Sequence, residues 1–229
     1  ERIDANLLNI SMEDLAMLNR KLFNDKIVNL QNKTTGTLII KEYPTASAHT
    51  GHIRTLVNEL ALKRTFKPDI IFVDYINICA SARFKPGSNV NSYTYIKAIA
   101  EEMRGLAVEL NLPIVTATQT TRTGFVSTDI GLEDTSESFG LPATADFMFA
   151  LISSEELERA GQMLVKQLKN RYNDPTLNRK FIIGVDRARM KLFDIEQAAQ
   201  NLIQPEEQKY VEHNSKDKET EEKYKDFNF

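Results

Sequence analysis

Three short apolar segments, separated by longer stretches, restrict this chain to a layered α/β fold. Residues 68–74 (PDIIFVD), 112–118 (LPIVTAT) and 147–152 (FMFALI) are near-continuous apolar runs, which are typical of strands covered on both faces. Residues 93–110, between the first two runs, carry apolar side chains at helical spacing. The order strand, helix, strand predicts parallel strands joined by right-handed crossovers.

Further helices and strands are predicted on both sides of this centre. Ser11 is expected to cap a helix in which Leu15, Leu18 and Leu22 recur at helical spacing. A short strand is predicted over 37–40. A helix is predicted over 50–63, and its buried side is expected to consist of Ile53, Leu56, Leu60 and Leu62. The last predicted strands cover residues 162–168, 181–185 and 190–193.

The composition is typical of a globular protein. The 229 residues are 41% hydrophobic and 27% charged, and this length is enough for one α/β domain with a sizeable core. No apolar run approaches the roughly 20 residues of a membrane span, and the first residues do not form a signal peptide. The single cysteine, Cys79, lies in an apolar run and is expected to be a small buried hydrophobe.

Charge is distributed unevenly and separates a domain from a tail. The net charge is −3, and residues 204–229 contain eight acidic and five basic side chains, so the other residues balance to zero. We therefore predict a folded domain over 1–203 and an acidic flexible tail over 204–229. Only a binding surface has to be basic, so the acidic balance does not exclude nucleic acid as a partner.

Polar side chains follow the first two predicted strands at their carboxyl ends, where parallel sheets bind ligands. Asp74 occupies the position at which a Walker B aspartate holds Mg²⁺ beside a nucleotide. Gln119 follows the next strand and could sense a γ-phosphate, while Arg122 could reach phosphate or DNA. The structural alternatives are an Asp that simply ends a buried strand and a loop amide satisfied by backbone groups.

Two cations mark a third strand end. Lys169 and Arg171 are two residues apart, so their side chains are expected to point the same way. At a subunit interface they could neutralise transition-state charge as an arginine finger does. The alternative is a pair of solvated cations without a catalytic role.

Two polar loops also follow strand ends. Residues 81–92 include Arg83 and Lys85, and residues 121–144 are rich in polar side chains with few large hydrophobes. Loops of this length in a compact domain are usually functional or disordered, and their hydroxyl and backbone N–H groups could hold DNA phosphates. A charged surface turn and a disordered loop are the alternatives.

Taken in order, these features resemble the motor domain of replicative hexameric DNA helicases of the DnaB type, in particular those of T4-like phages. The resemblance covers residues 1–196 and rests on the segments PDIIFVDYINI, ELNLPIVTATQTTRTG, GLEDTSESFGLPATADFMFAL and KNRYND. It implies a RecA-like α/β fold with a mainly parallel β-sheet flanked by helices. It also implies a homo-hexameric ring that hydrolyses ATP or another NTP with Mg²⁺ and translocates 5′→3′ on single-stranded DNA.

Roles for individual residues follow from the same resemblance. It implies Asp74 as the Mg²⁺ residue, Gln119 as the γ-phosphate sensor, and Lys169 and Arg171 as trans-acting catalytic cations. The DNA-backbone contacts that it implies are Ser136, Glu137, Phe139 and Gly140. Primase and a helicase loader are the implied partners, and the cytoplasm of a phage-infected bacterial cell is the implied location.

One motif of this family does not occur in the sequence. No G-x-x-x-x-G-K-[ST] segment is present, so the resemblance implies that the P-loop and the water-activating Glu lie N-terminal to residue 1. We therefore expect this polypeptide alone to be inactive.

Two other functions fit the sequence. A RecA-type recombinase would build filaments and exchange strands, and a non-catalytic replisome assembly subunit would carry a decayed nucleotide site. The tail aromatics Tyr224, Phe227 and Phe229 could dock on a primase or loader, or the tail could only keep the protein in solution.

Overall fold

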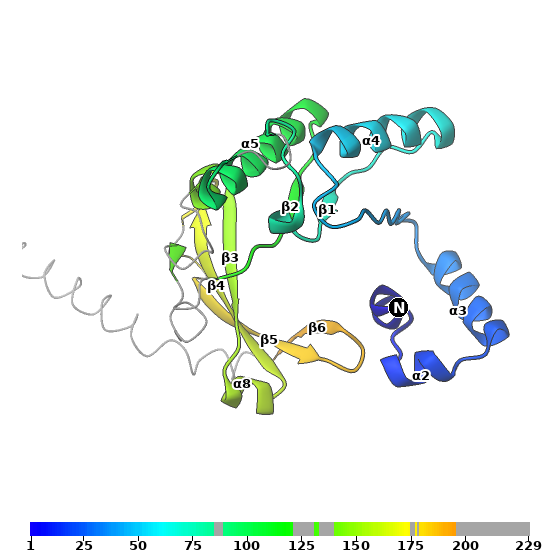
Figure 1. Ribbon diagram of the computed structural model, residues 1–229. Coiled ribbons are helices and arrows are strands. Elements are labelled where there is room, and N and C mark those ends of the chain that lie inside the picture. The colour runs from blue at the N-terminus through cyan, green and yellow to red at the C-terminus, as the bar shows by residue number, and fades with distance from the viewer. Residues whose placement is uncertain (85–88, 121–130, 133–139, 175–176, 178, 196–229) are drawn as a thin grey trace, which may run out of the picture. The chain divides into compact units, whose positions relative to one another are not determined.

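The computed structural model describes residues 1–84, 89–120, 131–132, 140–174, 177 and 179–195 (Figure 1). These residues form two compact units. The first unit comprises the described parts of Glu1–Thr35, Leu151–Lys166 and Lys180–Phe229, and the second those of Gly36–Ala150 and Gln167–Arg179. Lys85, Arg122, Ser136, Glu137, Phe139 and the predicted tail lie outside the described residues.

The second unit contains a parallel strand pair. Its elements in chain order are α4 (Thr50–Arg64), β1 (Ile71–Val73), η1 (Ile76–Ile78), α5 (Ser92–Leu110), β2 (Ile114–Thr116) and α7 (Gly140–Thr144). The register pairs Ile71 with Ile114 and Val73 with Thr116. β1, α5 and β2 therefore form the predicted strand–helix–strand unit.

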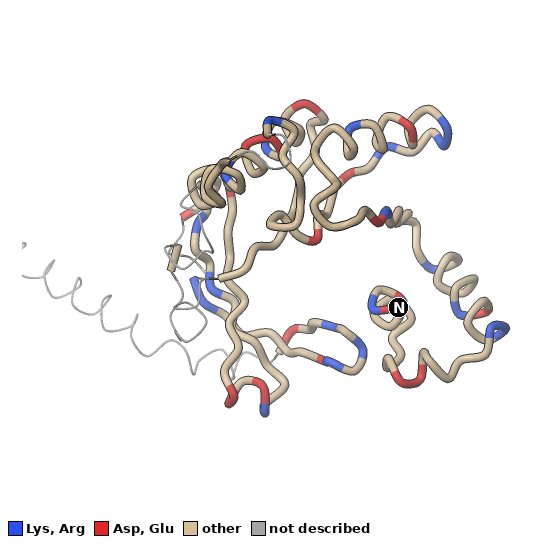
Figure 2. Tube along the Cα trace, in the orientation of Figure 1, with Lys and Arg blue, Asp and Glu red and all other residues tan. Residues whose placement is uncertain are grey.

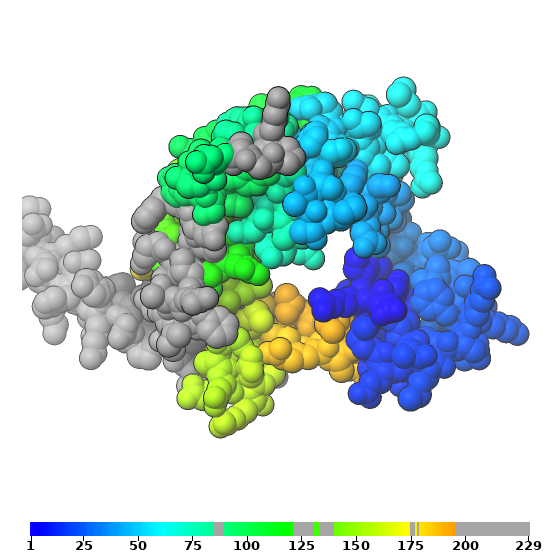
Figure 3. Space-filling model, viewed as in Figure 1, coloured from blue at the N-terminus to red at the C-terminus, as the bar shows by residue number. Residues whose placement is uncertain are grey.

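Helix α5 supplies most of the core of this unit. The Asn91 side chain accepts a hydrogen bond from the backbone N–H of Thr94 at 2.8 Å and caps the helix. The buried side chains of α5 are Ile96, Ala98, Ile99, Ala100, Met103 and Leu106. Several of them cluster with Ile76, Cys79 and Leu141, so η1 and α7 are fixed against α5. Helix α4 lies beside α5 on the face shown in Figure 3.

The first unit combines N-terminal helices with a hairpin. Its elements are α1 (Arg2–Leu8), α2 (Met12–Met17), α3 (Arg20–Lys33), α8 (Glu155–Arg159), β5 (Lys180–Asp186) and β6 (Lys191–Asp194). The turn between β5 and β6 accepts two hydrogen bonds from the N-terminal segment, from Met12 N to Ala188 O at 2.9 Å and from Asn6 Nδ2 to Met190 O at 2.6 Å.

Strands β3 (Phe147–Ile152) and β4 (Gln162–Asn170) each cross the boundary between the units. The sheet order is β3-β4-β5-β6, and the β4–β5 and β5–β6 pairs are antiparallel. β5 and β6 are joined by a tight turn, which can connect only antiparallel strands. The pair β1–β2 is parallel.

Most predicted elements are confirmed. Helix 93–110 corresponds to α5, helix 50–63 to α4 and strand 147–152 to β3, while the later strand predictions fall in β4, β5 and β6. Ser11 caps α2 as predicted, since its Oγ accepts from Asp14 N at 3.0 Å. Cys79 is buried, and this burial raises the pKa of its thiol. None of the described helices is both long and apolar enough to cross a membrane.

Other expectations were wrong. Residues 37–40 form no strand, and Leu38 and Ile40 are exposed, because strand propensity without a paired neighbour does not make a sheet. The helical spacing through Leu18 is interrupted, since Leu18 is extended and α3 begins after it. Leu62 is 86% exposed rather than buried. Phe72 in β1 is 68% exposed, and Phe147, Phe149 and Leu151 in β3 are about half-exposed, so neither strand is covered on both faces.

Candidate functional site

The carboxyl ends of β1 and β2 are tied together by side chains. Thr116 Oγ1 donates to Val73 O at 2.8 Å, and Thr118 Oγ1 donates to Asn77 Oδ1 at 2.8 Å. Gln119 Nε2 donates to the hydroxyl of Tyr75, the residue after Asp74, at 3.3 Å. The predicted Walker B carboxylate and the predicted sensor amide are therefore held at one edge of the parallel pair.

Asp74 is exposed, so its carboxylate is accessible to a hydrated cation. Among the described residues no group of three His, Cys, Asp or Glu side chains could hold a metal ion. Mg²⁺ can be bound through one protein carboxylate together with phosphate oxygens and water. Asp74 is the predicted carboxylate.

The predicted loop after η1 is anchored by Glu102, a residue of α5 whose side chain is only 7% exposed. Its carboxylate accepts from Ser81 Oγ at 2.5 Å and from the backbone N–H of Ala82 at 2.8 Å. Arg83 is exposed, and its guanidinium pairs with Glu101 at 2.5 Å. Glu102 thus fixes the start of the loop that presents Arg83, one of the predicted DNA contacts.

Replacing Glu102 by Ala is expected to destabilise the protein by about 2 kcal/mol, because the buried hydroxyl of Ser81 and the backbone N–H of Ala82 lose their acceptor. Urea denaturation followed by circular dichroism measures the change. Glu101→Ala is the matched control, since that exposed carboxylate lies next to Glu102 on the same helix and should contribute less than about 1 kcal/mol. Equal losses in the two variants would contradict the anchoring role of Glu102.

Lys169 and Arg171 meet the carboxyl-terminal end of α7. The Lys169 ammonium donates to Pro142 O and, at 3.5 Å, to Ala143 O, and Arg171 Nη2 donates to Ala143 O at 2.9 Å. The expectation that the two side chains point the same way is confirmed, since both reach one carbonyl oxygen. Carbonyls in the last turn of a helix lack partners within the helix and favour cations.

An acidic residue completes this cluster. Asp146 Oδ1 accepts from Arg104 Nη1 at 2.7 Å and from Arg171 Nη1 at 3.1 Å. Hydrogen bonding to Arg104, with the charge of Arg171 in addition, holds the pKa of the Asp146 carboxyl below its ordinary value. Burial lowers the pKa of the Lys169 ammonium, and the charge of Arg171 lowers it further. Three cations therefore surround one ionised carboxylate.

The predicted catalytic residues lie in two clusters within the described part of the chain. Asp74 and Gln119 lie at the β1–β2 edge, while Lys169 and Arg171 lie at the end of α7. Gly140, a predicted DNA contact, is buried at the first position of α7. Glu102, Arg104 and Asp146 were missed, because an acid or a base within a helix or before a strand carries no distinctive local pattern.

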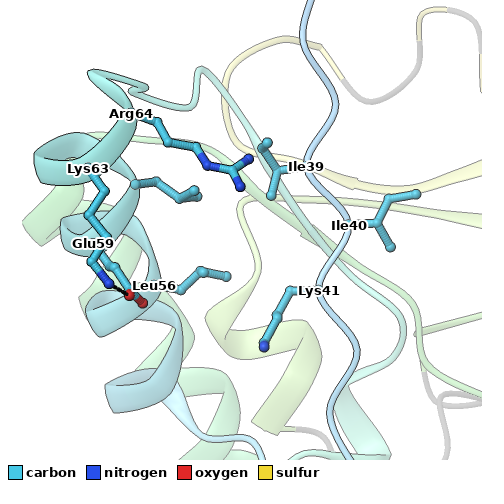
Figure 4. A pocket seen from close by; sticks show the side chains of 8 residues that line it. Ile39, Ile40, Lys41, Leu56, Glu59, Lys63 and Arg64 are labelled. Atoms are coloured by element: carbon cyan, nitrogen blue, oxygen red, sulfur yellow. Dashed lines mark hydrogen bonds and ion pairs between the residues drawn. The ribbon is translucent and has the colours of Figure 1, made fainter.

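A pocket of about 400 Å³ lies between residues 39–41 and helix α4 (Figure 4). Its lining includes Ile39, Ile40, Leu56 and Leu60 together with an ion pair between Lys63 and Glu59. None of the predicted site residues lines it, so it is separate from the two clusters. Figure 2 shows charges of both signs along α4 and α5 rather than a face of one sign.

Comparison with known proteins identifies relatives of the chain. Residues 2–175 match the model of the DnaB-like helicase C terminal domain. The chain is 43% identical over 228 residues to the DnaB-like replicative helicase of Enterobacteria phage T4, covering 94% of this chain and 48% of that protein. It is 29% identical over 123 residues to a probable plasmid replicative DNA helicase of Chlamydia muridarum (strain MoPn / Nigg), covering 53% of this chain and 26% of that protein.

Solved structures show the same fold. One of them, described as an ATPase domain, aligns with a TM-score of 0.68 at 16% identity, covering 85% of this chain and 69% of that chain. A DnaB-like replicative helicase, described with its interactions with primase, aligns with a TM-score of 0.67 at 16% identity, covering 85% and 47%. These alignments confirm the predicted RecA-like α/β fold. The chain spans about half the length of the phage relative (48%).

Proposed function

Because the chain belongs to the DnaB-like helicase C-terminal domain family, we propose that it is the C-terminal part of a replicative DNA helicase motor. The motor hydrolyses ATP or another NTP with Mg²⁺ and translocates 5′→3′ on single-stranded DNA as a hexameric ring. The observation that carries this proposal is the β1–β2 edge, where Thr116 bonds to Val73, the residue before Asp74, and Gln119 bonds to Tyr75, the residue after it. Ligands of parallel sheets bind at this kind of edge.

The two clusters suggest a division of labour across a subunit interface. Mg²⁺ would neutralise charge on the phosphates and link them to the protein. Asp74 holds the cation through its carboxylate, and Gln119 contacts the terminal phosphate, with Arg122 as a further phosphate contact. Lys169 and Arg171 act on the nucleotide of the neighbouring subunit, where their charge stabilises the transferring phosphoryl group.

DNA contacts are proposed for the two polar loops. Arg83 supports this because Glu102 fixes the start of its loop while the guanidinium remains half-exposed. The other proposed DNA contacts are Lys85, Ser136, Glu137, Phe139 and Gly140. A primase is a proposed partner because one structural neighbour was described with its interactions with primase. A helicase loader is a second proposed partner. The proposed location is the interior of an infected bacterial cell, because the relative is a phage protein.

The proposed activity belongs to a protein in which this chain is joined to a P-loop. The 229 residues contain no G-x-x-x-x-G-K-[ST] segment, and without the P-loop Lys and Ser/Thr the phosphates and Mg²⁺ lose most of their ligands. We expect the 229-residue chain alone to hydrolyse no nucleotide above background, as measured by phosphate release with single-stranded DNA present. Hydrolysis by the chain alone above background would contradict this expectation.

The test of function uses the complete protein encoded by the gene. Its nucleotide hydrolysis should rise on adding single-stranded DNA, and it should unwind a forked duplex that carries a 5′ tail. Electron microscopy with nucleotide should show closed rings. Open filaments together with strand exchange would instead identify a recombinase, and DNA-independent assembly without hydrolysis would identify a non-catalytic subunit.

A further inference from the structure

We propose that Asp146 and Arg104 are positioning residues that orient the guanidinium of Arg171 toward a phosphoryl group bound by the neighbouring subunit. This inference rests on the proposed function, because it takes Arg171 to be the trans-acting cation. It adds two residues, one immediately before β3 and one from α5, that would not themselves touch the nucleotide.

The guanidinium of Arg171 is held at two points. Nη1 donates to Asp146 Oδ1 at 3.1 Å, and Nη2 donates to Ala143 O at 2.9 Å. The backbone N–H of Arg171 also donates to Asp146 O at 3.0 Å. Two acceptors on different terminal nitrogens fix the plane of a guanidinium, and neither bond uses Nε. The Arg171 side chain remains 45% exposed, so a ligand can reach it.

Arg104 fixes the carboxylate that does this orienting. Its Nη1 donates to the same oxygen of Asp146 at the shorter distance of 2.7 Å, and also to Thr144 O at 2.7 Å. Arg104 therefore holds Asp146 in place from the α5 side, while Arg171 takes the longer bond. Because both arginines bond to the same oxygen, the Asp146 carboxylate can orient Arg171 while Arg104 neutralises much of the carboxylate's negative charge.

The charge balance of the cluster favours an anionic ligand. Arg104, Lys169 and Arg171 face one carboxylate, Asp146, and three carbonyl oxygens of α7, from Pro142, Ala143 and Thr144. Among the described residues of this cluster, three positive charges stand against one negative charge. A phosphoryl group has several acceptor oxygens, so it is a ligand that Lys169 and Arg171, held in fixed orientations, could bind well.

A purely structural ion-pair network would behave differently from a positioning network. Exposed ion pairs contribute little to stability, so a structural role predicts at most a small change in melting temperature and an unaltered turnover number. A positioning role predicts a loss in kcat that depends on the presence of Arg171. The dependence can be measured as a double-mutant cycle.

Asp146→Asn in the complete protein is the primary test, because asparagine preserves the shape but loses the charge and one strong acceptor. We expect kcat for DNA-stimulated hydrolysis to fall about 10- to 100-fold, the range for a misplaced catalytic group, with KM within about threefold. Arg104→Ala should lower kcat in the same way, and Asp146→Glu should restore part of it. Asp186→Asn is the matched control, since Asp186 also pairs with an arginine, Arg189, at 2.7 Å.

The Arg171→Ala variant distinguishes failure of the proposed finger role from failure of the positioning role. If Arg171→Ala itself leaves kcat intact, the proposed finger role fails, independently of Asp146. If Arg171→Ala lowers kcat while Asp146→Asn and Arg104→Ala keep the wild-type value, the positioning inference is overturned and the finger role stands. Equal further losses from Asp146→Asn with and without Arg171 would also overturn the inference. No further loss in the Arg171→Ala background is the expected result.

Discussion

Arg171→Ala in the complete protein is expected to reduce DNA-stimulated nucleotide hydrolysis about 1000-fold, the lower end of the range for a trans-acting arginine. The structure motivates this because Arg171 combines a fixed guanidinium plane with substantial exposure at the α7 cluster. Phosphate release at saturating DNA and nucleotide measures the effect. Ring assembly and DNA affinity should stay close to wild type, since Arg171 is assigned to neither.

Arg187→Ala provides the control for this variant. Arg187 is also an exposed arginine at a strand end, and its ion pair with Glu158 spans 3.0 Å. It should retain wild-type hydrolysis within about twofold, since an exposed pair contributes little. If both variants lost activity and assembled poorly, the loss of hydrolysis in Arg171→Ala would not be specific to that residue.

Subunit mixing tests whether Arg171 acts across the interface. Subunits with Arg171→Ala retain Asp74, and subunits with Asp74→Asn retain Arg171, so a mixed ring contains some interfaces with both groups intact. Mixed rings should therefore hydrolyse more nucleotide than either variant alone. A mixture no more active than its separate components, despite verified subunit exchange, would argue against action in trans.

The elements that could be predicted are those whose pattern is complete within their own residues. Helix α5 has a cap at Asn91 and apolar side chains at helical spacing, and β3 is a run bounded by polar residues. Residues 37–40 have the same apolar character as β3 but form no strand, because pairing depends on a neighbour that local sequence does not specify. The prediction that Leu62 is buried was wrong for a similar reason, since helical spacing does not determine which apolar side chain contacts the core.

The same division applies to the candidate site. Asp74 and Gln119 could be predicted to share an edge because parallel strands place their carboxyl ends together, and the bond between Gln119 and Tyr75 is consistent with this. The contact between Arg104 and Asp146 could not be predicted, because the two residues are 42 positions apart and neither stands in a distinctive local pattern. The residues assigned to catalysis thus follow from topology, while those that orient them depend on tertiary packing.

Asp74→Asn is expected to lower hydrolysis by the complete protein at least about 100-fold, a loss typical of removing one charged group from a transition-state site. Asparagine keeps the size of the side chain and one neutral oxygen, so the strand end should not be disturbed. The variant should also need more Mg²⁺ for its residual activity, because a neutral ligand binds the cation less tightly. Titrating phosphate release against Mg²⁺ at fixed nucleotide measures both effects.

Asp69→Asn is the matched control, because Asp69 is an exposed aspartate that precedes the same strand at its opposite end. The control should keep both the turnover number and the Mg²⁺ dependence of the wild type. Arg171→Ala, by contrast, should lose turnover without a change in Mg²⁺ dependence, since its charge acts on the phosphoryl group from the neighbouring subunit. If Asp74→Asn and Arg171→Ala shifted the Mg²⁺ requirement equally, the two clusters could not have the separate roles proposed here, and Asp74 would not be the residue that holds the cation.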